Sequence, residues 1–314
     1  MKTTHRMTRI AAALLATSLM AGCASSQRSG ADDTYAALYD GESTTAYSTA
    51  FPVASPQEAY RNGDAAMNSG DPDRALFEYL RGLKMEKSPQ AEPLYKIGTI
   101  HHRRDNHRLA MLAYQWALEV DAGYIGAKTG LGIVYLQQRQ YDQAAQQLQP
   151  VVDSGKAPWQ AFNALGVIAD IQGDYAKAQG YYEQGLADNP MVPRMLNNLG
   201  YSHYLEGDWP AARQALRQAL ANDPGYELAW RNLGLVHARD GDYDFAIEAV
   251  ARNGERAEAF NDIGYIAMVE GRYAEAMNFF QEAMRLSPAY YVTASENARQ
   301  LDLMVRRDNG LFEE

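Results

Sequence analysis

Two short stretches of the sequence hold residue types that bind metals or phosphates. The run "HHRRDNH", His101 to His107, gathers three histidines, which are common metal ligands. However, His101, His203 and His237 each lie three residues after a recurring glycine, so the pattern indicates a packing position. The run "GAKTGLG", Gly126 to Gly132, lacks the Gly-Lys-Thr or Gly-Lys-Ser ending of a phosphate-binding loop. We therefore expect neither a metal site nor a nucleotide site.

Patterns of the common catalytic nucleophiles and of zinc enzymes are missing as well. The sequence has no serine elbow, no zincin helix and no cysteine nucleophile, and carboxylates such as Asp170 and Glu206 read as scattered, solvated groups. A net charge of -10 and a pI near 5.2 argue against nucleic acid, because tracking phosphates needs clustered Lys and Arg. We predict a protein that is not an enzyme and uses no cofactor.

Cys23 is the only cysteine in 314 residues, which excludes an internal disulfide. A cationic start and an apolar run from Ile10 to Met20 precede it, and this run is too short to span a bilayer. The segment resembles a bacterial lipoprotein signal, with Met20 where Leu, Val or Ile is usual. The resemblance implies cleavage before Cys23, a lipid such as palmitate on its sulfur and, because Ala24 rather than Asp follows, the periplasmic face of a Gram-negative outer membrane.

Two other interpretations of this segment stay open: cleavage after Ala24 by an ordinary signal peptidase, and an uncleaved anchor. Residues 24–55 are rich in Ser, Thr and Ala and have little periodicity, so we expect a flexible tether. Within it, "TYAALYD" (Thr34 to Asp40) could form a helical turn on contact with another surface, but we favour a chance pattern within the tether.

From residue 56 the chain repeats with a period near 34. The spacings between successive glycines of one column are 35, 34, 34, 34, 34 and 30, and an alanine lies twelve residues after each. The glycine column is Gly63, Gly98, Gly132, Gly166, Gly200, Gly234 and Gly264.

The clearest unit runs from Leu196 to Pro224 and reads as two amphipathic helices that break at "EGDW". Apolar and small residues recur at steps of three and four in both halves, Gly207 with Asp208 supplies the turn, and Asp223-Pro224 closes the unit.

This pattern resembles the tetratricopeptide repeat (TPR), which implies an all-α solenoid of about seven helix-turn-helix repeats that forms a right-handed superhelix. The expected organisation is a signal over 1–22, the lipidated cysteine and tether over 23–55, the array over 56–290, and a capping helix and tail over 291–314. Four residues are missing from the sixth repeat, whose second helix should end near Asn253-Gly254. We interpret this as a tolerated deletion, with a kink that opens a binding edge as the alternative.

The resemblance also implies where a partner binds. In TPR proteins the concave groove is lined by first-helix residues that point away from the packing face, here three before the glycine and one and four after it. Asparagines can hydrogen-bond to an extended peptide, and tyrosines offer broad contacts with a polar tip. The predicted groove residues are Asn163, Asn197, Tyr201, Tyr204, Arg231, Asn261, Tyr265 and Met268.

Three groups of lipidated TPR proteins share this organisation. The sequence from Ala161 to Pro190, together with the "LNNLGYSHYLEGDWPAARQAL" that follows, resembles the TadD-like lipoproteins of Flp (tight-adherence) pilus assembly. Pilotin-like lipoproteins of type IV pili and NlpI-like scaffolds for peptidoglycan hydrolases are similar in architecture. The expected partners are therefore envelope proteins or peptides, and a glycan carrier is the alternative of another class, because tyrosine-rich grooves stack on sugars.

The lipoprotein interpretation makes a direct prediction. Cys23→Ser should leave the repeats folded but release the protein from the membrane fraction, because no other residue offers the thiol that carries the lipid. Labelling with a fatty-acid analogue, followed by fractionation, measures both effects. An unlabelled wild-type protein, or a Cys23→Ser protein that stays in the membrane, would contradict it.

Overall fold

The computed structural model describes residues 35–40, 52–252, 254–287 and 291–308. The predicted signal segment, Cys23, the closing Pro288 and residues 309–314 lie outside the described residues. Within the described ranges the regular structure is all helical, and consists of the short 3-10 helix η1 (Ala36–Leu38) and the α-helices α2 to α16. This confirms the predicted all-α solenoid.

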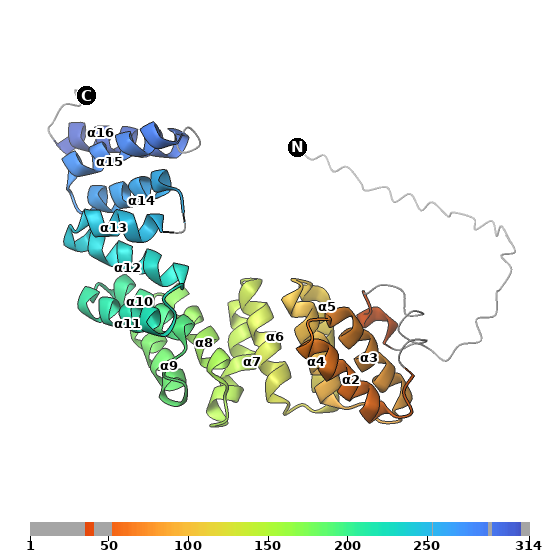
Figure 1. Ribbon diagram of the computed structural model, residues 1–314. Coiled ribbons are helices and arrows are strands. Elements are labelled where there is room, and N and C mark those ends of the chain that lie inside the picture. The colour runs from red at the N-terminus through yellow and green to blue at the C-terminus, as the bar shows by residue number, and fades with distance from the viewer. Residues whose placement is uncertain (1–34, 41–51, 253, 288–290, 309–314) are drawn as a thin grey trace, which may run out of the picture.

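Each repeat is a pair of antiparallel helices, which we call its first and second helix. The pairs follow one another along the chain (Figure 1), and α16 closes the series. The helices are α2 (Pro56–Asn68), α3 (Pro72–Met85), α4 (Ala91–Arg103), α5 (His107–Val120), α6 (Ile125–Gln137), α7 (Tyr141–Asp153), α8 (Trp159–Ile171), α9 (Tyr175–Asp188), α10 (Pro193–Glu206), α11 (Trp209–Asn222), α12 (Glu227–Asp240), α13 (Tyr243–Ala251), α14 (Arg256–Val269), α15 (Tyr273–Leu286) and α16 (Tyr291–Asp308).

The break inside each repeat comes from a residue with a positive φ, and in repeats one, two, four and five the next side chain caps the second helix. Gly207 ends α10 with a φ of 95°, and the Asp208 carboxylate accepts a hydrogen bond from the Ala211 amide (3.1 Å) at the start of α11. The predicted turn at "EGDW" is therefore confirmed. The residue seven after the column glycine has a positive φ in every repeat, and is a glycine in five of them. Asp105 and Arg139, both with a φ of 60°, take this position in repeats two and three.

The glycine column marks the closest approach of the two helices in a repeat. A Cβ on any of these glycines would come within 3.0 Å of the side chain sixteen residues later, on the second helix. That side chain is always apolar or a tyrosine: Tyr79, Tyr114, Leu148, Tyr182, Leu216, Val250 and Phe280. Each hairpin is thus closed by one large side chain seated on a helix backbone.

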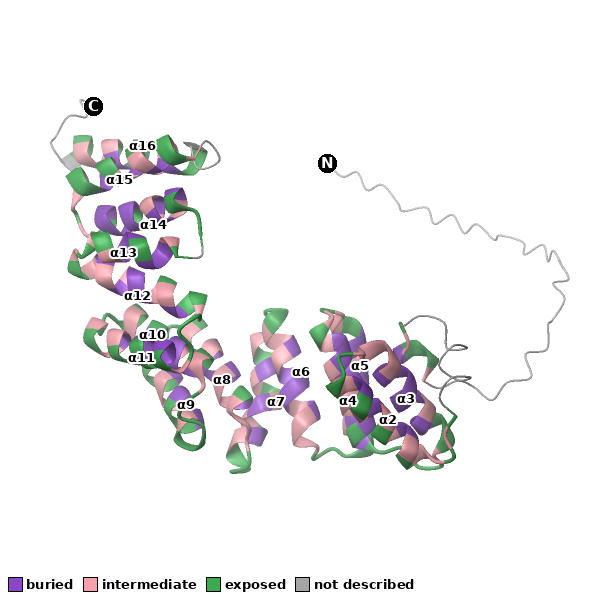
Figure 2. Cartoon of the chain, viewed as in Figure 1, coloured by how far each residue is buried: buried purple, intermediate pink, exposed green. Residues whose placement is uncertain are grey.

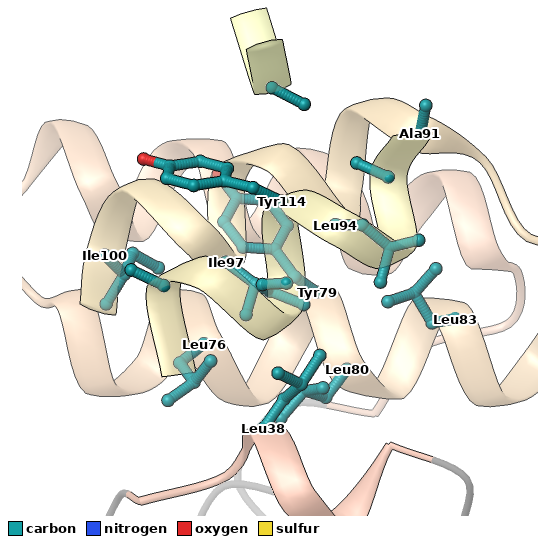
Figure 3. Close-up of a cluster of buried hydrophobic side chains, with 14 of the residues drawn as sticks. Leu38, Leu76, Tyr79, Leu80, Leu83, Ala91, Leu94, Ile97, Ile100 and Tyr114 are labelled. Atoms are coloured by element: carbon teal, nitrogen blue, oxygen red, sulfur yellow. The ribbon is translucent and has the colours of Figure 1, made fainter. Parts of the chain in front are cut away.

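The core is a chain of small clusters rather than one centre. Buried residues lie along the facing sides of paired helices, while the turns are exposed (Figure 2). The largest cluster spans repeats one and two and the start of repeat three (Figure 3), and five more follow along the array. Each repeat is stabilised by its neighbours, as in other solenoids.

The array curves (Figure 1), and its first helices pack more closely on one another than its second helices do, which puts the first helices on the inner side. First helices of successive repeats pack directly on each other from α4 to α14, and α14 continues this series to α16. Among the described residues, second helices of successive repeats make no contact of similar extent. We call the surface of the first helices the inner face and that of the second helices the outer face.

The sixth repeat is short, as predicted. Its second helix, α13, has nine residues where the other second helices have 13 or 14, and it ends at Ala251. Arg252 follows and places its guanidinium over the ring of Trp230, 4.4 Å from the centroid. First-helix packing between α12 and α14 continues across the deletion.

One expectation about the tether is wrong. Tyr35 to Asp40 pack against the first two repeats instead of lacking fixed structure, and the Leu38 side chain is completely buried (Figure 3). Its contacts are with residues far along the sequence, which is why the composition of the segment did not reveal them.

Helix closure at the glycine column can be tested within repeat four. Gly166→Ala should lower the free energy of unfolding by about 1–3 kcal/mol, because its Cβ would collide with the buried Tyr182 ring. Urea denaturation followed by circular dichroism measures the change.

Gly180, on α9 of the same repeat, is the matched control. A Cβ there meets nothing within 4 Å, so Gly180→Ala should stabilise the helix by about 0.5–1 kcal/mol. Equal effects of the two substitutions would contradict the close approach.

Candidate partner-binding groove

The inner face carries an apolar column at the position one residue after each glycine in repeats three to seven. Its members are Ile133, Val167, Tyr201, Leu235 and Tyr265. Tyr201 and Tyr265 are the most exposed, at 38% and 49%. Because first helices pack side by side, these side chains line one continuous strip of surface.

The strip deepens into a hollow of about 340 Å³ between repeats five and seven, which we call the aromatic pocket. Helices α10, α12 and α14 supply most of its wall, and Asn297 of α16 reaches its edge. Its principal side chains are Tyr201, Tyr204, Leu235, Arg239, Tyr265 and Val269. The hollow exposes more apolar than polar surface, so it suits an apolar side chain of a partner.

The two tyrosines of α10 form a fixed platform. The rings of Tyr201 and Tyr204 stack at 5.9 Å with an interplanar angle of 19°. The Arg239 guanidinium lies 5.5 Å from the Tyr204 centroid, its Nε donates to the Tyr204 hydroxyl (3.2 Å), and the same side chain pairs with Glu270. Burial raises the pKa of the Tyr201 hydroxyl, which therefore stays a neutral donor.

Charges around the aromatic pocket are already paired. Arg231 is half exposed, and its guanidinium lies 3.0 Å from Glu258 and 2.6 Å from Asp262. Since Arg239 is held by Glu270, neither arginine offers a free cation to a carboxylate ligand. This agrees with an apolar rather than an acidic partner segment.

The predicted asparagines bond to other asparagines of the array, and Asn261 also lines the aromatic pocket. The side-chain oxygens of Asn163, Asn197 and Asn261 each accept a hydrogen bond of 2.9–3.0 Å from an asparagine of the next repeat or of α16. The donors are Asn198, Asn232 and Asn297. This asparagine ladder joins successive first helices.

Burial limits what the ladder can offer a ligand. Asn197 and Asn261 are 4% and 7% exposed, and the Asn197 amide nitrogen also donates to Asn198 (3.2 Å). The Asn197 amide is thus buried and engaged in the ladder, whereas we expected it to be exposed to a peptide. Met268 also departs from the prediction: it is 5% exposed and packs in the core near Phe280 and Leu301.

Asp170 is not the solvated carboxylate that we expected. It accepts hydrogen bonds from Tyr182 of α9 (2.7 Å) and Ser202 of α10 (2.6 Å), and so links three helices. Burial raises the pKa of its carboxyl, while the two hydrogen bonds act in the opposite direction. The isolated amphipathic pattern gave no sign of these partners, because they lie on other helices.

Sequence reasoning missed Arg239 and Val269 as pocket residues. Both lie five residues after the column glycine, one helical turn beyond Leu235 and Tyr265, so they share the face of the apolar column. The helical period was the signal that could have found them.

The first two repeats carry another hollow, which has an ion pair in its wall. This second hollow, of about 390 Å³, lies between α2 and α4, where Asp64 accepts hydrogen bonds from Tyr79 (2.6 Å) and Lys96 (2.7 Å).

In the part of the chain that the structure describes, no group of three His, Cys, Asp or Glu side chains is arranged to hold a metal ion. None of the described helices is long and apolar enough to cross a membrane.

Family comparisons decide what this array is. One model of the tetratricopeptide repeat matches residues 129–178, 172–227 and 206–252, and another matches residues 257–290, so that together they span half of the chain. The chain belongs to the TPR family. Both matching models describe repeats, and neither describes a catalytic domain.

Among curated proteins, the photosystem I assembly protein Ycf3 from two Prochlorococcus marinus strains is 33% identical over 78 residues. That alignment covers 24% of this chain and 45% of Ycf3, so the chain spans less than half the length of these curated relatives.

Solved structures show the same fold. A TPR protein from Parabacteroides merdae superposes with a TM-score of 0.54 at 16% identity, over 78% of this chain and 98% of that one. PilF of Pseudomonas aeruginosa superposes with a TM-score of 0.54 at 17% identity, over 68% of this chain and 97% of PilF. A chain of the Cut9–Hcn1 complex of the APC/C superposes with a TM-score of 0.59 at 17% identity, over 82% of this chain and 51% of that one.

The link made by Asp170 predicts a stability effect. Asp170→Ala should lower the free energy of unfolding by about 1–3 kcal/mol, because it leaves the Tyr182 and Ser202 hydroxyls without their acceptor. Urea denaturation measures the loss. Asp188→Ala, at the exposed end of α9, is the control, and a loss of the same size there would show that Asp170 has no special role.

Proposed function

We propose that this TPR protein is a non-enzymatic scaffold that holds a segment of a partner protein in the aromatic pocket. The observation that carries the proposal is the exposed pair Tyr201 and Tyr265 on one hollow of the inner face. Aromatic side chains exposed together on a concave surface are typical of binding sites. The ladder pair Asn261 and Asn297 borders the same pocket and holds α14 to α16.

The partner segment that fits the pocket is apolar or aromatic where it enters. Tyr201, Leu235 and Tyr265 supply contact area, while the tyrosine hydroxyls can hydrogen-bond to its backbone. A glycan is the second candidate ligand, favoured by the stacked and exposed rings of Tyr201 and Tyr204.

We also propose that a lipid on Cys23 holds the scaffold at the periplasmic face of the outer membrane. The support is the resemblance of residues 1–23 to a lipoprotein signal and the absence of any other cysteine in the sequence. A groove tied to the membrane brings its partner to the membrane surface.

The cell-envelope machine that we favour is a Flp/Tad pilus or its secretin. The support is the local resemblance of repeats four and five to TadD-like lipoproteins, together with the name of the related Ycf3, an assembly protein of another complex. An NlpI-like scaffold for peptidoglycan hydrolases and a pilotin-like lipoprotein of type IV pili are the alternatives.

Partner capture tests the proposal. The double variant Tyr201→Ala, Tyr265→Ala should reduce recovery of the cross-linked partner from envelopes about tenfold or more, since aromatic anchors dominate such interfaces. Mass spectrometry of the wild-type capture separates the machines: secretin or pilus components support pilus assembly, and hydrolases without them overturn it in favour of the NlpI-like scaffold.

Two controls locate the binding site. Leu228→Ala with Met191→Ala removes exposed apolar side chains that do not line the aromatic pocket and should leave recovery unchanged. Arg217→Ala alters the polar hollow on the outer face of α11. Loss of the partner with Arg217→Ala but not with the tyrosine variant would move the site to the outer face.

A further inference from the structure

A short segment that precedes the repeats is seated on them. Tyr35 to Asp40, which we call the clasp, form the 3-10 helix η1 and its flanks, and η1 contacts α5. Leu38 has no exposed surface and belongs to the same buried cluster as Leu76 and Leu80 of α3, beside which it lies in Figure 3. The clasp thus adds a side chain to the core of repeats one and two.

Polar groups of the array hold the clasp backbone and its carboxylate. The Leu38 carbonyl lies 2.8 Å from Nε2 of His101, a completely buried side chain at the end of α4. Asp40 lies 3.3 Å from His101 Nδ1, and accepts from Arg104 (3.2 Å) and Asn106 (3.3 Å). One buried histidine therefore faces two acceptors of the same short segment.

An aromatic contact fixes the other end of the clasp. The Tyr35 ring meets Trp116 of α5 edge to face, with centroids 5.9 Å apart and an interplanar angle of 72°. The clasp thus makes three kinds of contact over six residues: an aromatic edge, a buried leucine and a clamped carboxylate. All three lie at α3, α5 and the end of α4, away from the inner face of the first helices.

We propose that repeats one and two contain a built peptide site on their outer side, separate from the aromatic pocket, that takes the sequence Tyr-x-x-Leu-x-Asp and is filled by the chain's own residues 35–40. The clasp ties the start of the chain to the outer side of the array. The clasp does not cover the inner face, which stays accessible to a partner. This assignment does not depend on the lipid or on the partner.

The site can be tested with the full chain and a labelled peptide. Leu38→Asp should empty the site, because a carboxylate replaces a buried leucine, while Ala37→Asp, at an exposed position of the same turn, should not. A fluorescent peptide of residues 33–42 should bind the Leu38→Asp chain at least about tenfold more tightly than it binds the wild-type or Ala37→Asp chain, in which the site is occupied.

Peptide variants keep the test independent of protein folding. Peptides carrying Leu38→Ala or Asp40→Ala should bind the emptied chain at least about tenfold more weakly than the unchanged peptide, because each substitution removes one of the three contacts. Equal binding of the peptide to all three chains, or of all peptides to the emptied chain, would overturn the proposal.

Hydrogen exchange and mass measurement decide whether the chain fills its own site. In the wild type the Leu38 and Tyr39 amides, which bond to Tyr35 and Ala36, should exchange more slowly than in the free peptide, and the protein should be monomeric. Exchange as fast as in the free peptide would overturn the clasp. A wild-type dimer that Leu38→Asp converts to a monomer would show that the segment binds a second copy instead.

Discussion

The array depends on one repeated contact: a large side chain of each second helix seated on a glycine of the first. Seven glycines meet seven such side chains at the same spacing of sixteen residues, and a Cβ at any of them would collide. The short sixth repeat keeps its pair, Gly234 and Val250, because the deletion falls after it. Each of these contacts closes one hairpin, and first helices of successive repeats pack on each other from α4 to α14.

That alignment divides each first helix into surfaces with separate tasks. The glycine face meets the second helix, the asparagine ladder joins successive first helices, and the positions one and five after the glycine stay open on the inner face. Tyr201, Tyr265 and Val269 can therefore be exposed without weakening the stack. Asn197 and Asn261 lie one helical turn before Tyr201 and Tyr265, so the ladder and the apolar column are neighbours on the same side of these helices.

Sequence periodicity was enough to predict the fold, the turn at Gly207 and the shortened sixth repeat, since each depends on residues close along the chain. It placed Tyr201, Tyr204 and Tyr265 on the aromatic pocket. Sequence periodicity did not predict the contacts between repeats. Nothing in the local sequence distinguishes Asn197 as a ladder residue, Met268 as a core residue or Leu38 as a buried one. Those roles are set by partners that only the folded array brings near.

We propose that the inner face at repeats five to seven binds the partner. Photo-crosslinking in intact cells tests it most directly, with the reactive residue placed at Leu235 or Val269 in the aromatic pocket and at Arg217 on the outer face. The account predicts one shared protein adduct from Leu235 and Val269 and none from Arg217. An adduct from Arg217 with none from the pocket positions would contradict it.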